Sequence, residues 1–205
     1  MPEFADFLEI QTRTAWGKTL LGFAEWSLSA GKRISLALDI GTGPGLLPAL
    51  LATRGNLQAI GLDTDYNLLR AAPASIPVTL GCAAALPFPA ASFDLLTATN
   101  VIFLLGNPLH ALGECRRILK PGGSLCLLNP SEHLSISSAT ALADARGLTG
   151  KNRESLLGWA ARAEKHGGWT EAHARNLHTL AGFQLEETLL RVGPGFARFT
   201  RASIP

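Results

Sequence analysis

The sequence predicts an α/β fold, a mostly parallel sheet with helices on both faces. Short apolar runs alternate with segments whose apolar residues recur at helical spacing, a pattern typical of strands alternating with helices. The first apolar run, 34–40, leads into a glycine-rich loop and then into a helical segment, 46–53. Hydrophobic residues make up 47% of the chain and charged residues 17%, as expected of a compact domain. We expect a single domain over 1–205, because 205 residues suffice for a full α/β core.

The charge and the cysteine content of the sequence disfavour several classes of function. The formal net charge is +2 without a block of like charges, which indicates a mixed solvated surface and disfavours a nucleic-acid partner. No apolar run approaches the roughly 18 residues of a membrane span, and nothing resembles a secretory signal. Cys82, Cys115 and Cys126 lack metal-type spacing, and three is poor material for a disulfide framework. We therefore expect a cytoplasmic protein without a metal site.

The stretch Asp39–Gly45, Asp-Ile-Gly-Thr-Gly-Pro-Gly, is the candidate ligand site. Glycine permits a tight turn and the close approach of a ligand to the backbone. The following helix presents unpaired N–H groups and a partial positive charge, which suit a carboxylate or a phosphate. A dinucleotide fingerprint G-x-G-x-x-G would place its third glycine at Leu46, whereas Gly45 comes one residue early. The spacing thus disfavours a nicotinamide-dependent oxidoreductase.

A second apolar run, 57–62, ends at Asp63, the candidate ribose ligand. One carboxylate can accept hydrogen bonds from both vicinal hydroxyls of a ribose. Asp63 follows Gly41 at close to the interval of about 20 residues at which such an acid occurs in nucleotide-binding folds. The alternative role for Asp63 is that of a helix cap. Asp65 suits capping better, because it directly precedes the predicted helix 66–72.

The remaining elements follow in order. We expect an N-terminal helical region over 4–26. Strands are expected at 78–81, 92–100, 124–128, 183–190 and 196–201. Asn107 and Pro108 suit the cap and the first position of a helix that runs to about Leu119. Three helices, 139–146, 154–165 and 170–180, are expected between the fifth and sixth strands.

Several motifs resemble class I S-adenosylmethionine-dependent methyltransferases, most of all the ubiquinone/menaquinone-type group. The D-x-G-x-G-x-G spacing that starts at Asp39 matches the cofactor loop of that family. Leu86-Pro87-Phe88, Ser92-Phe93-Asp94 and the run Arg-x-Leu-Lys-Pro-Gly-Gly from Arg117 to Gly123 also match. The resemblance extends over about 34–200, and its specific motifs lie within 39–123.

The resemblance implies a Rossmann-like, seven-stranded, mostly parallel sheet with a helical insertion, 131–182, on the substrate side between strands five and six. It also implies an N-terminal helical lid, 1–31. The cofactor would be S-adenosylmethionine and the product S-adenosylhomocysteine. We expect cofactor contacts from Asp39, Gly41, Thr42, Gly43, Asp63, Thr64, Cys82, Ala83 and Asn100. At Cys82 the family has an acid that accepts from the adenine amino group; a thiol accepts weakly, so backbone at Cys82 and Ala83 would carry this contact.

The sequence says less about the methyl acceptor than about the cofactor. Asn100-Val101-Ile102-Phe103 lacks the Asn-Pro-Pro-Tyr type motif of DNA base methyltransferases, and Phe103-Leu104 replaces the His pair of many small-molecule members. We therefore expect a small-molecule acceptor, with the acceptor atom and the oligomeric state open. Glu132 and His133, directly after the fifth strand, are the candidate catalytic residues, and a solvated loop or cap is the alternative for His133. The rival function is a non-catalytic S-adenosylmethionine-binding sensor or partner subunit.

Overall fold

Seven strands form one sheet, in the order β3-β2-β1-β4-β5-β7-β6. The computed structural model describes residues 14–204. The strands are β1 (Leu36–Ile40), β2 (Gln58–Asp63), β3 (Val78–Leu80), β4 (Phe93–Thr99), β5 (Leu119–Pro130), β6 (Gln184–Arg191) and β7 (Ala197–Ser203). Neighbours from β3 to β5 pair in parallel, and β7 runs antiparallel to both β5 and β6. The predicted seven-stranded, mostly parallel sheet is confirmed.

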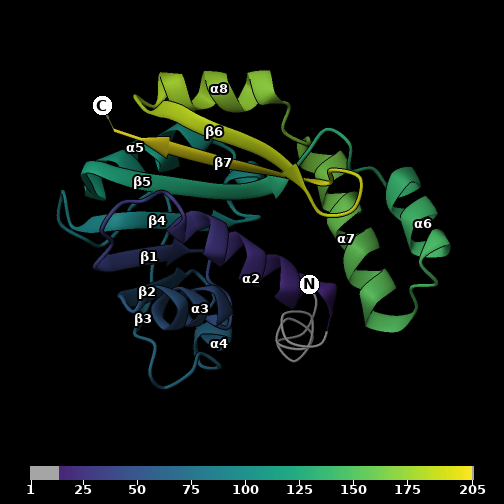
Figure 1. Ribbon diagram of the computed structural model, residues 1–205, viewed down its shortest axis with the longest axis horizontal. Coiled ribbons are helices and arrows are strands. Elements are labelled where there is room, and N and C mark those ends of the chain that lie inside the picture. The colour runs from purple at the N-terminus through teal and green to yellow at the C-terminus, as the bar shows by residue number, and fades with distance from the viewer. Residues whose placement is uncertain (1–13, 205) are drawn as a thin grey trace.

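Helices connect the strands and cover both faces of the sheet (Figure 1). They are α2 (Ala15–Leu28), α3 (Leu46–Gly55), α4 (Tyr66–Leu69), the 3₁₀ helix η1 (Ile102–Leu104), α5 (Pro108–Ile118), α6 (Ile136–Ala145), α7 (Gly150–His166) and α8 (Glu171–Leu180). The side chain of Asp65 caps α4 and that of Asn107 caps α5, as predicted. The part of the expected N-terminal helix that precedes residue 14 lies outside the described residues.

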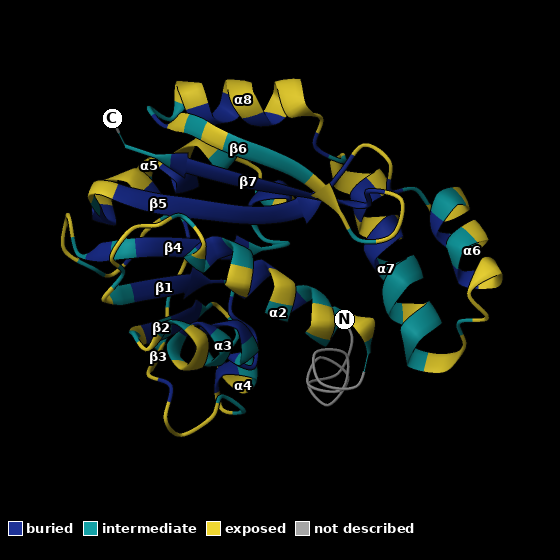
Figure 2. Cartoon of the chain, viewed as in Figure 1, coloured by how far each residue is buried: buried dark blue, intermediate teal, exposed yellow. Residues whose placement is uncertain are grey.

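Two apolar clusters form the core, one on each face of the sheet. On one face α2 and α3 pack through residues such as Phe23 and Leu51, joined by the inner side of α7. On the other face α5 and α8 pack through residues such as Leu112 and Leu177. In Figure 2, β1, β4 and β5 are buried almost throughout, as is typical of central parallel strands.

The helices between β5 and β6 do not form one unit. Helices α6 and α7 pack against each other and extend beyond the carboxyl end of β5 (Figure 1). By contrast, α8 lies on the sheet against β6 and α5, and its Ala174, Leu177 and His178 are buried. The expectation of three substrate-side helices therefore needs correction, because α8 belongs to the layer that covers the sheet.

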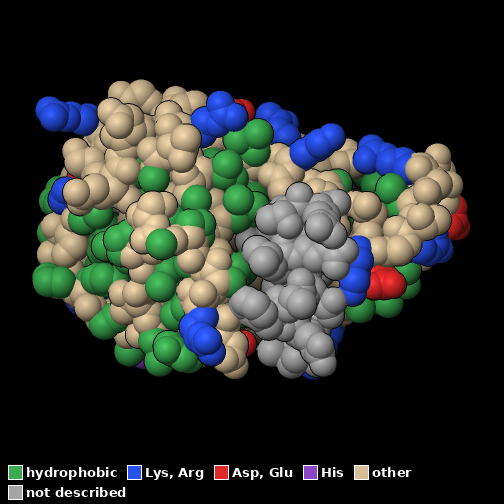
Figure 3. All heavy atoms as spheres, turned by 90° about the horizontal axis from the view of Figure 1, so that it is seen from below, with side chains coloured by type: hydrophobic (Ala, Val, Ile, Leu, Met, Phe, Trp, Pro, Cys, Tyr) green, Lys and Arg blue, Asp and Glu red, His purple; other side chains and the backbone are tan. Residues whose placement is uncertain are grey.

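The surface agrees with the balanced charge of the sequence. On the face drawn in Figure 3, Lys and Arg side chains are scattered along the edges and do not gather into one patch. No helix within residues 14–204 is long and apolar enough to cross a membrane. In the same residues no group of three or more His, Cys, Asp or Glu side chains could hold a metal ion.

Candidate cofactor site

The glycine loop joins β1 to α3 at the carboxyl end of the sheet. Gly41, Gly43 and Gly45 all have positive φ, at 70°, 56° and 78°, a region that favours glycine. A Cβ on Gly41 would also overlap the side chain of Val101. The N–H of Gly41 donates to Leu62 O at 2.7 Å, which ties the loop to the end of β2. The three glycines thus leave stretches of backbone uncovered by side chains at the N-terminus of α3.

A buried carboxyl group lies beneath the loop. Asp39 is 1% exposed and accepts a hydrogen bond from Thr97 Oγ1 at 2.8 Å. Burial raises the pKa of Asp39 to about 7, against the lowering effect of that hydrogen bond. Thr42 Oγ1 is also buried; it lies close enough to the Asp39 carboxyl group to lower its pKa, but within residues 14–204 it makes no hydrogen bond of ordinary geometry. A buried polar atom without such a bond at a glycine loop is a group that a bound ligand could satisfy.

Asp63, at the end of β2, contacts the loop directly. Its Oδ2 accepts from the N–H of Gly43 at 2.8 Å, and its Oδ1 accepts from the N–H of Asp65 at 3.0 Å. The carboxylate therefore holds the loop and the turn that follows β2. It is only partly buried, and each oxygen can accept a further hydrogen bond. Thr64 beside it is exposed. This arrangement suits a ribose without excluding the capping role.

Cys82 lies beside Asp63, just after β3. The preceding Gly81 donates its N–H to Asp63 O at 2.9 Å, so the turn that follows runs along the end of β2. The thiol is exposed, and its sulfur accepts a weak contact from Ala84 N at 3.5 Å. Ala83 as a whole is 5% exposed and belongs to the core.

Asn100 directly follows β4 and connects this strand to α7. Its φ is +57°, a conformation that Asn tolerates better than most residues. Its Oδ1 accepts from Trp159 Nε1 of α7 at 2.9 Å. The ring of Trp159 in turn lies edge-on to Trp16 of α2, with centroids 5.6 Å apart. The sequence analysis missed Trp159, which links α2 and α7 to the end of β4.

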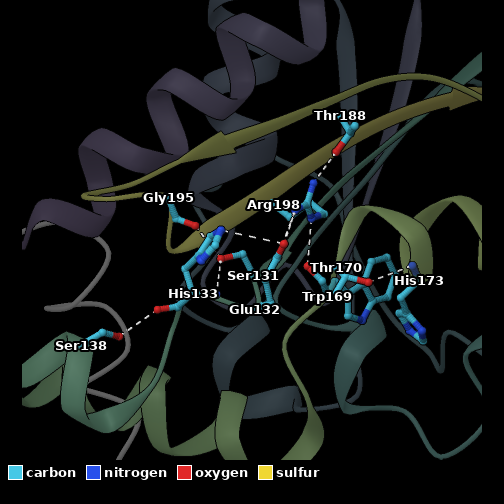
Figure 4. A network of polar contacts seen from close by, with 10 residues as sticks. All are labelled: Ser131, Glu132, His133, Ser138, Trp169, Thr170, His173, Thr188, Gly195 and Arg198. Atoms are coloured by element: carbon cyan, nitrogen blue, oxygen red, sulfur yellow. Dashed lines mark hydrogen bonds and ion pairs between the residues drawn. The ribbon is translucent and has the colours of Figure 1, made fainter.

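The candidate catalytic pair follows β5, and the structure gives its members different surroundings. Both oxygens of Glu132 accept from Arg198 Nη2, at 2.8 and 3.0 Å (Figure 4). Burial opposes ionisation, yet the Arg198 guanidinium holds the pKa of Glu132 below its ordinary value. His133 is exposed, and its Nε2 lies 3.9 Å from Glu132 Oε1.

Arg198, which the sequence analysis also missed, is the centre of this network. It is 4% exposed, and it also donates from Nε to Trp169 O and from Nη1 to Thr188 Oγ1, both at 2.9 Å. A carboxylate with a lowered pKa that neutralises a buried cation is a weak base. The geometry therefore favours an anchoring role for Glu132 over the predicted role as a base.

The residues present fit S-adenosylmethionine in most respects. The glycine loop and the α3 N-terminus suit its carboxylate, Asp63 suits the ribose hydroxyls, and Thr42 offers a hydroxyl without an ordinary hydrogen bond. Cys82 is the exception, because its thiol cannot replace the acceptor strength of an acid.

Comparison with known proteins supports the same family. Residues 38–127 match the model of a methyltransferase domain family. An uncharacterized methyltransferase of Schizosaccharomyces pombe is 28% identical over 188 residues, which cover 77% of this chain and 64% of that protein. The ubiquinone/menaquinone biosynthesis C-methyltransferase of Syntrophotalea carbinolica is 34% identical over 121 residues, covering 52% and 51% of the two chains.

The chain thus spans between half and two thirds of the length of these two relatives. Among solved structures, a SAM-dependent methyltransferase from Aquifex aeolicus superposes with a TM-score of 0.70 at 16% identity, over the full length of both chains. That likeness shows the fold. Residues 38–127 thus carry a methyltransferase domain, and the whole chain has the fold of that S-adenosylmethionine-dependent methyltransferase.

Proposed function

We propose that this protein transfers a methyl group from S-adenosylmethionine to a small-molecule acceptor. The observation that carries the proposal is the contact between Asp63 and the glycine loop, which joins the candidate ribose ligand to the candidate methionine cradle through one 2.8 Å hydrogen bond. Both halves of a nucleoside-linked amino acid could then be held by backbone and one carboxylate at the same edge of the sheet.

Each residue of the site has a proposed role. Asp63 accepts from the ribose hydroxyls, and the loop N–H groups at Gly41–Gly45 face the methionine carboxylate. Thr42 supplies a hydroxyl, and Thr64 lines the exposed edge beside the ribose. Backbone at Cys82 and Ala83 holds the adenine. Asp39 supports the loop from below, where it bonds to Thr97 and does not reach solvent.

The covering of the site comes from α2 and α7. The contacts of Trp159 with Asn100 and Trp16 bring both helices over the end of β4. When bound, S-adenosylmethionine supplies an electrophilic methyl group on a sulfonium. The protein would then mainly orient the acceptor and exclude water. Holding two reactants in the correct geometry can supply a large part of a rate enhancement. Asn100, at the end of β4, is placed to contact the methionine end.

A dedicated base is not part of this proposal. Because Arg198 engages both oxygens of Glu132, we expect Glu132 to shape the site, with His133 as an exposed neighbour. Their catalytic role stays a prediction that kinetics can test. The engaged Glu132 and the thiol at Cys82 also lend weight to the rival function, a cofactor-binding subunit without catalysis.

A small-molecule acceptor is supported by the low net charge and by one relative. The formal net charge of only +2, without a block of like charges in the sequence, disfavours a nucleic-acid substrate, which needs a basic patch. The Syntrophotalea relative is named for ubiquinone/menaquinone biosynthesis.

The test is the release of S-adenosylhomocysteine from S-adenosylmethionine, measured over a panel of small acids, phenols and quinols. Acceptor-dependent release supports the enzyme. Tight binding of S-adenosylhomocysteine with no release over the whole panel favours the sensor, and failure to bind either compound rejects both.

A further inference from the structure

A pocket of about 350 Å³ opens beside the carboxyl end of β4, between the β4–α5 connection and the α7–α8 connection. Its walls include Phe103 and Leu105 on one side and His166, Trp169 and His173 on the other. The volume falls within the range of about 300–1,000 Å³ that is usual for small-molecule sites. Neither the glycine loop nor Glu132 lines it, whereas Trp169 belongs both to its wall and to the Arg198 network.

The walls of the pocket are fixed by hydrogen bonds to the sheet (Figure 4). The N–H of Trp169 donates to Pro130 O at 2.8 Å, and Trp169 O accepts from Arg198 Nε at 2.9 Å. A Cβ on Gly168 would overlap the carbonyl of Ser131, so the backbone of the α7–α8 connection lies directly against the end of β5. A pocket with walls fixed in advance loses little ordering entropy when a ligand binds.

The opposite wall is also anchored to the sheet. The N–H of Phe103 donates to Asn129 Oδ1 at 3.4 Å. The amide nitrogen of Asn129 is buried and has no hydrogen-bond partner among residues 14–204. Such a donor beside the backbone of a pocket residue is unusual in a folded chain.

The chemistry of the pocket suits an aromatic ring that bears an acidic group. Phe103 and Trp169 line the pocket with only 6% and 3% of their surface exposed, and each lies edge-on to an imidazole: Phe103 to His166 at 6.1 Å and Trp169 to His173 at 5.5 Å between centroids. Both imidazoles are exposed and can donate hydrogen bonds. No acidic residue is among the described residues that line the pocket. A ring that contacts the exposed edges of these two aromatic residues would therefore lie beside imidazole N–H donors, which suit a carboxylate.

The pocket adjoins the candidate cofactor site. Val101 packs against Gly41 of the glycine loop, and the next two residues, Ile102 and Phe103, line the pocket. The residue that contacts the loop is thus followed directly in the chain by two residues of the pocket wall.

We propose that this pocket binds a small aromatic acid, selected by Phe103 and Trp169 for its ring and by His166 and His173 for its acid. That this ligand is the methyl acceptor rests on the proposed function. The binding itself does not depend on catalysis, and it can be measured without a cofactor.

The test titrates 2-naphthoate into the full chain and follows ligand fluorescence, with 2-naphthalenemethanol as the neutral analogue of the same ring. Leu105→Trp places an indole in the pocket. Its matched control is Leu104→Trp, because Leu104 is the adjacent residue, is 37% exposed and does not line the pocket. The double variant His166→Gln/His173→Gln removes both imidazoles. Its control is His110→Gln, an exposed histidine of α5 outside the pocket.

We expect saturable binding of 2-naphthoate to the natural chain and to both controls. Leu105→Trp should weaken it by about tenfold or more, and the double variant should lose a preference of about tenfold for the acid over the alcohol. Absence of saturable binding, equal binding by Leu105→Trp, or an unchanged acid preference in the double variant would overturn the proposal.

A parallel titration with S-adenosylhomocysteine separates the two proposals and checks that each variant is folded. Retained S-adenosylhomocysteine affinity with no naphthoate binding rejects the pocket and leaves the methyltransferase proposal standing. Naphthoate binding without any S-adenosylhomocysteine binding supports the pocket and rejects the methyltransferase proposal.

Discussion

Replacing Asp39 by Asn should change how the stability of the protein depends on pH. Asp39 is 1% exposed, and burial raises its pKa from 3.8 to about 7. In the unfolded chain the carboxyl group loses its proton near its ordinary pKa, whereas in the folded chain it keeps the proton to about neutrality. The folded state therefore binds more protons between these two values, and the contribution of Asp39 to stability falls as the pH rises.

The size of the effect follows from the shift. Each pH unit in this interval costs about 1.4 kcal/mol of unfolding free energy, so the loss between about pH 5 and about pH 7 is roughly 2 kcal/mol. The amide that Asp39→Asn introduces does not titrate, and its oxygen can still accept from Thr97 Oγ1. Asp39→Asn should thus gain stability relative to the natural chain as the pH rises, and the gain should level off above about pH 7.

Urea unfolding at a series of pH values measures this difference, and taking the difference cancels the titration of other groups. Asp94→Asn is the control. The pKa of Asp94 is lowered by Lys120 and by the N–H groups of Ser35 and Leu36, which outweigh desolvation. Its loss should cost the same stability throughout the range from about pH 5 to about pH 8. A constant difference for Asp39→Asn would refute the argument that its carboxyl group is protonated in the fold.

Three further changes test the surroundings of the site. Cys82→Asp should keep or tighten S-adenosylhomocysteine binding by calorimetry, because an acid accepts better than a thiol; weaker binding would mean that apolar packing holds the adenine. Glu132→Gln should lower the unfolding free energy by about 2 kcal/mol, because Arg198 would remain buried without its counter-charge. Lost turnover with unchanged stability would instead indicate a base. Trp159→Phe removes the donor to Asn100 and reduces the ring that contacts Trp16, and it should speed amide exchange in α2 and α7 but not in β1; unchanged exchange would show that other contacts hold the two helices.

The features that the sequence predicted correctly depend on neighbours in the chain. Asp65 and Asn107 cap the helices that directly follow them, and the apolar run before Asp63 ends where β2 ends. Such signals need only a few residues of context. The seven-stranded, mostly parallel sheet followed from the family resemblance and is confirmed.

The missed features depend on residues far apart in the chain. Arg198 contacts Glu132 across 66 positions, and Trp159 contacts Asn100 across 59. No pattern in the neighbouring residues distinguishes a buried Arg from an exposed one. The pairing of Glu132 with Arg198 could therefore not be predicted, and the sequence alone indicates a base at Glu132. Periodicity likewise identified α8 as a helix, but it could not separate a helix packed on the sheet from the pair α6–α7 beyond its edge.

Calorimetric titration with S-adenosylhomocysteine tests the central claim most directly. The natural chain should bind, and Asp63→Ala should bind more weakly by about 1.5–3 kcal/mol, the range for hydrogen bonds to a charged group. Asp65→Ala, two residues away, should lose about 1 kcal/mol of stability as a missing cap and keep its affinity. No binding by the natural chain, or equal affinity of the Asp63 and Asp65 variants, would contradict the assignment of this site to the cofactor.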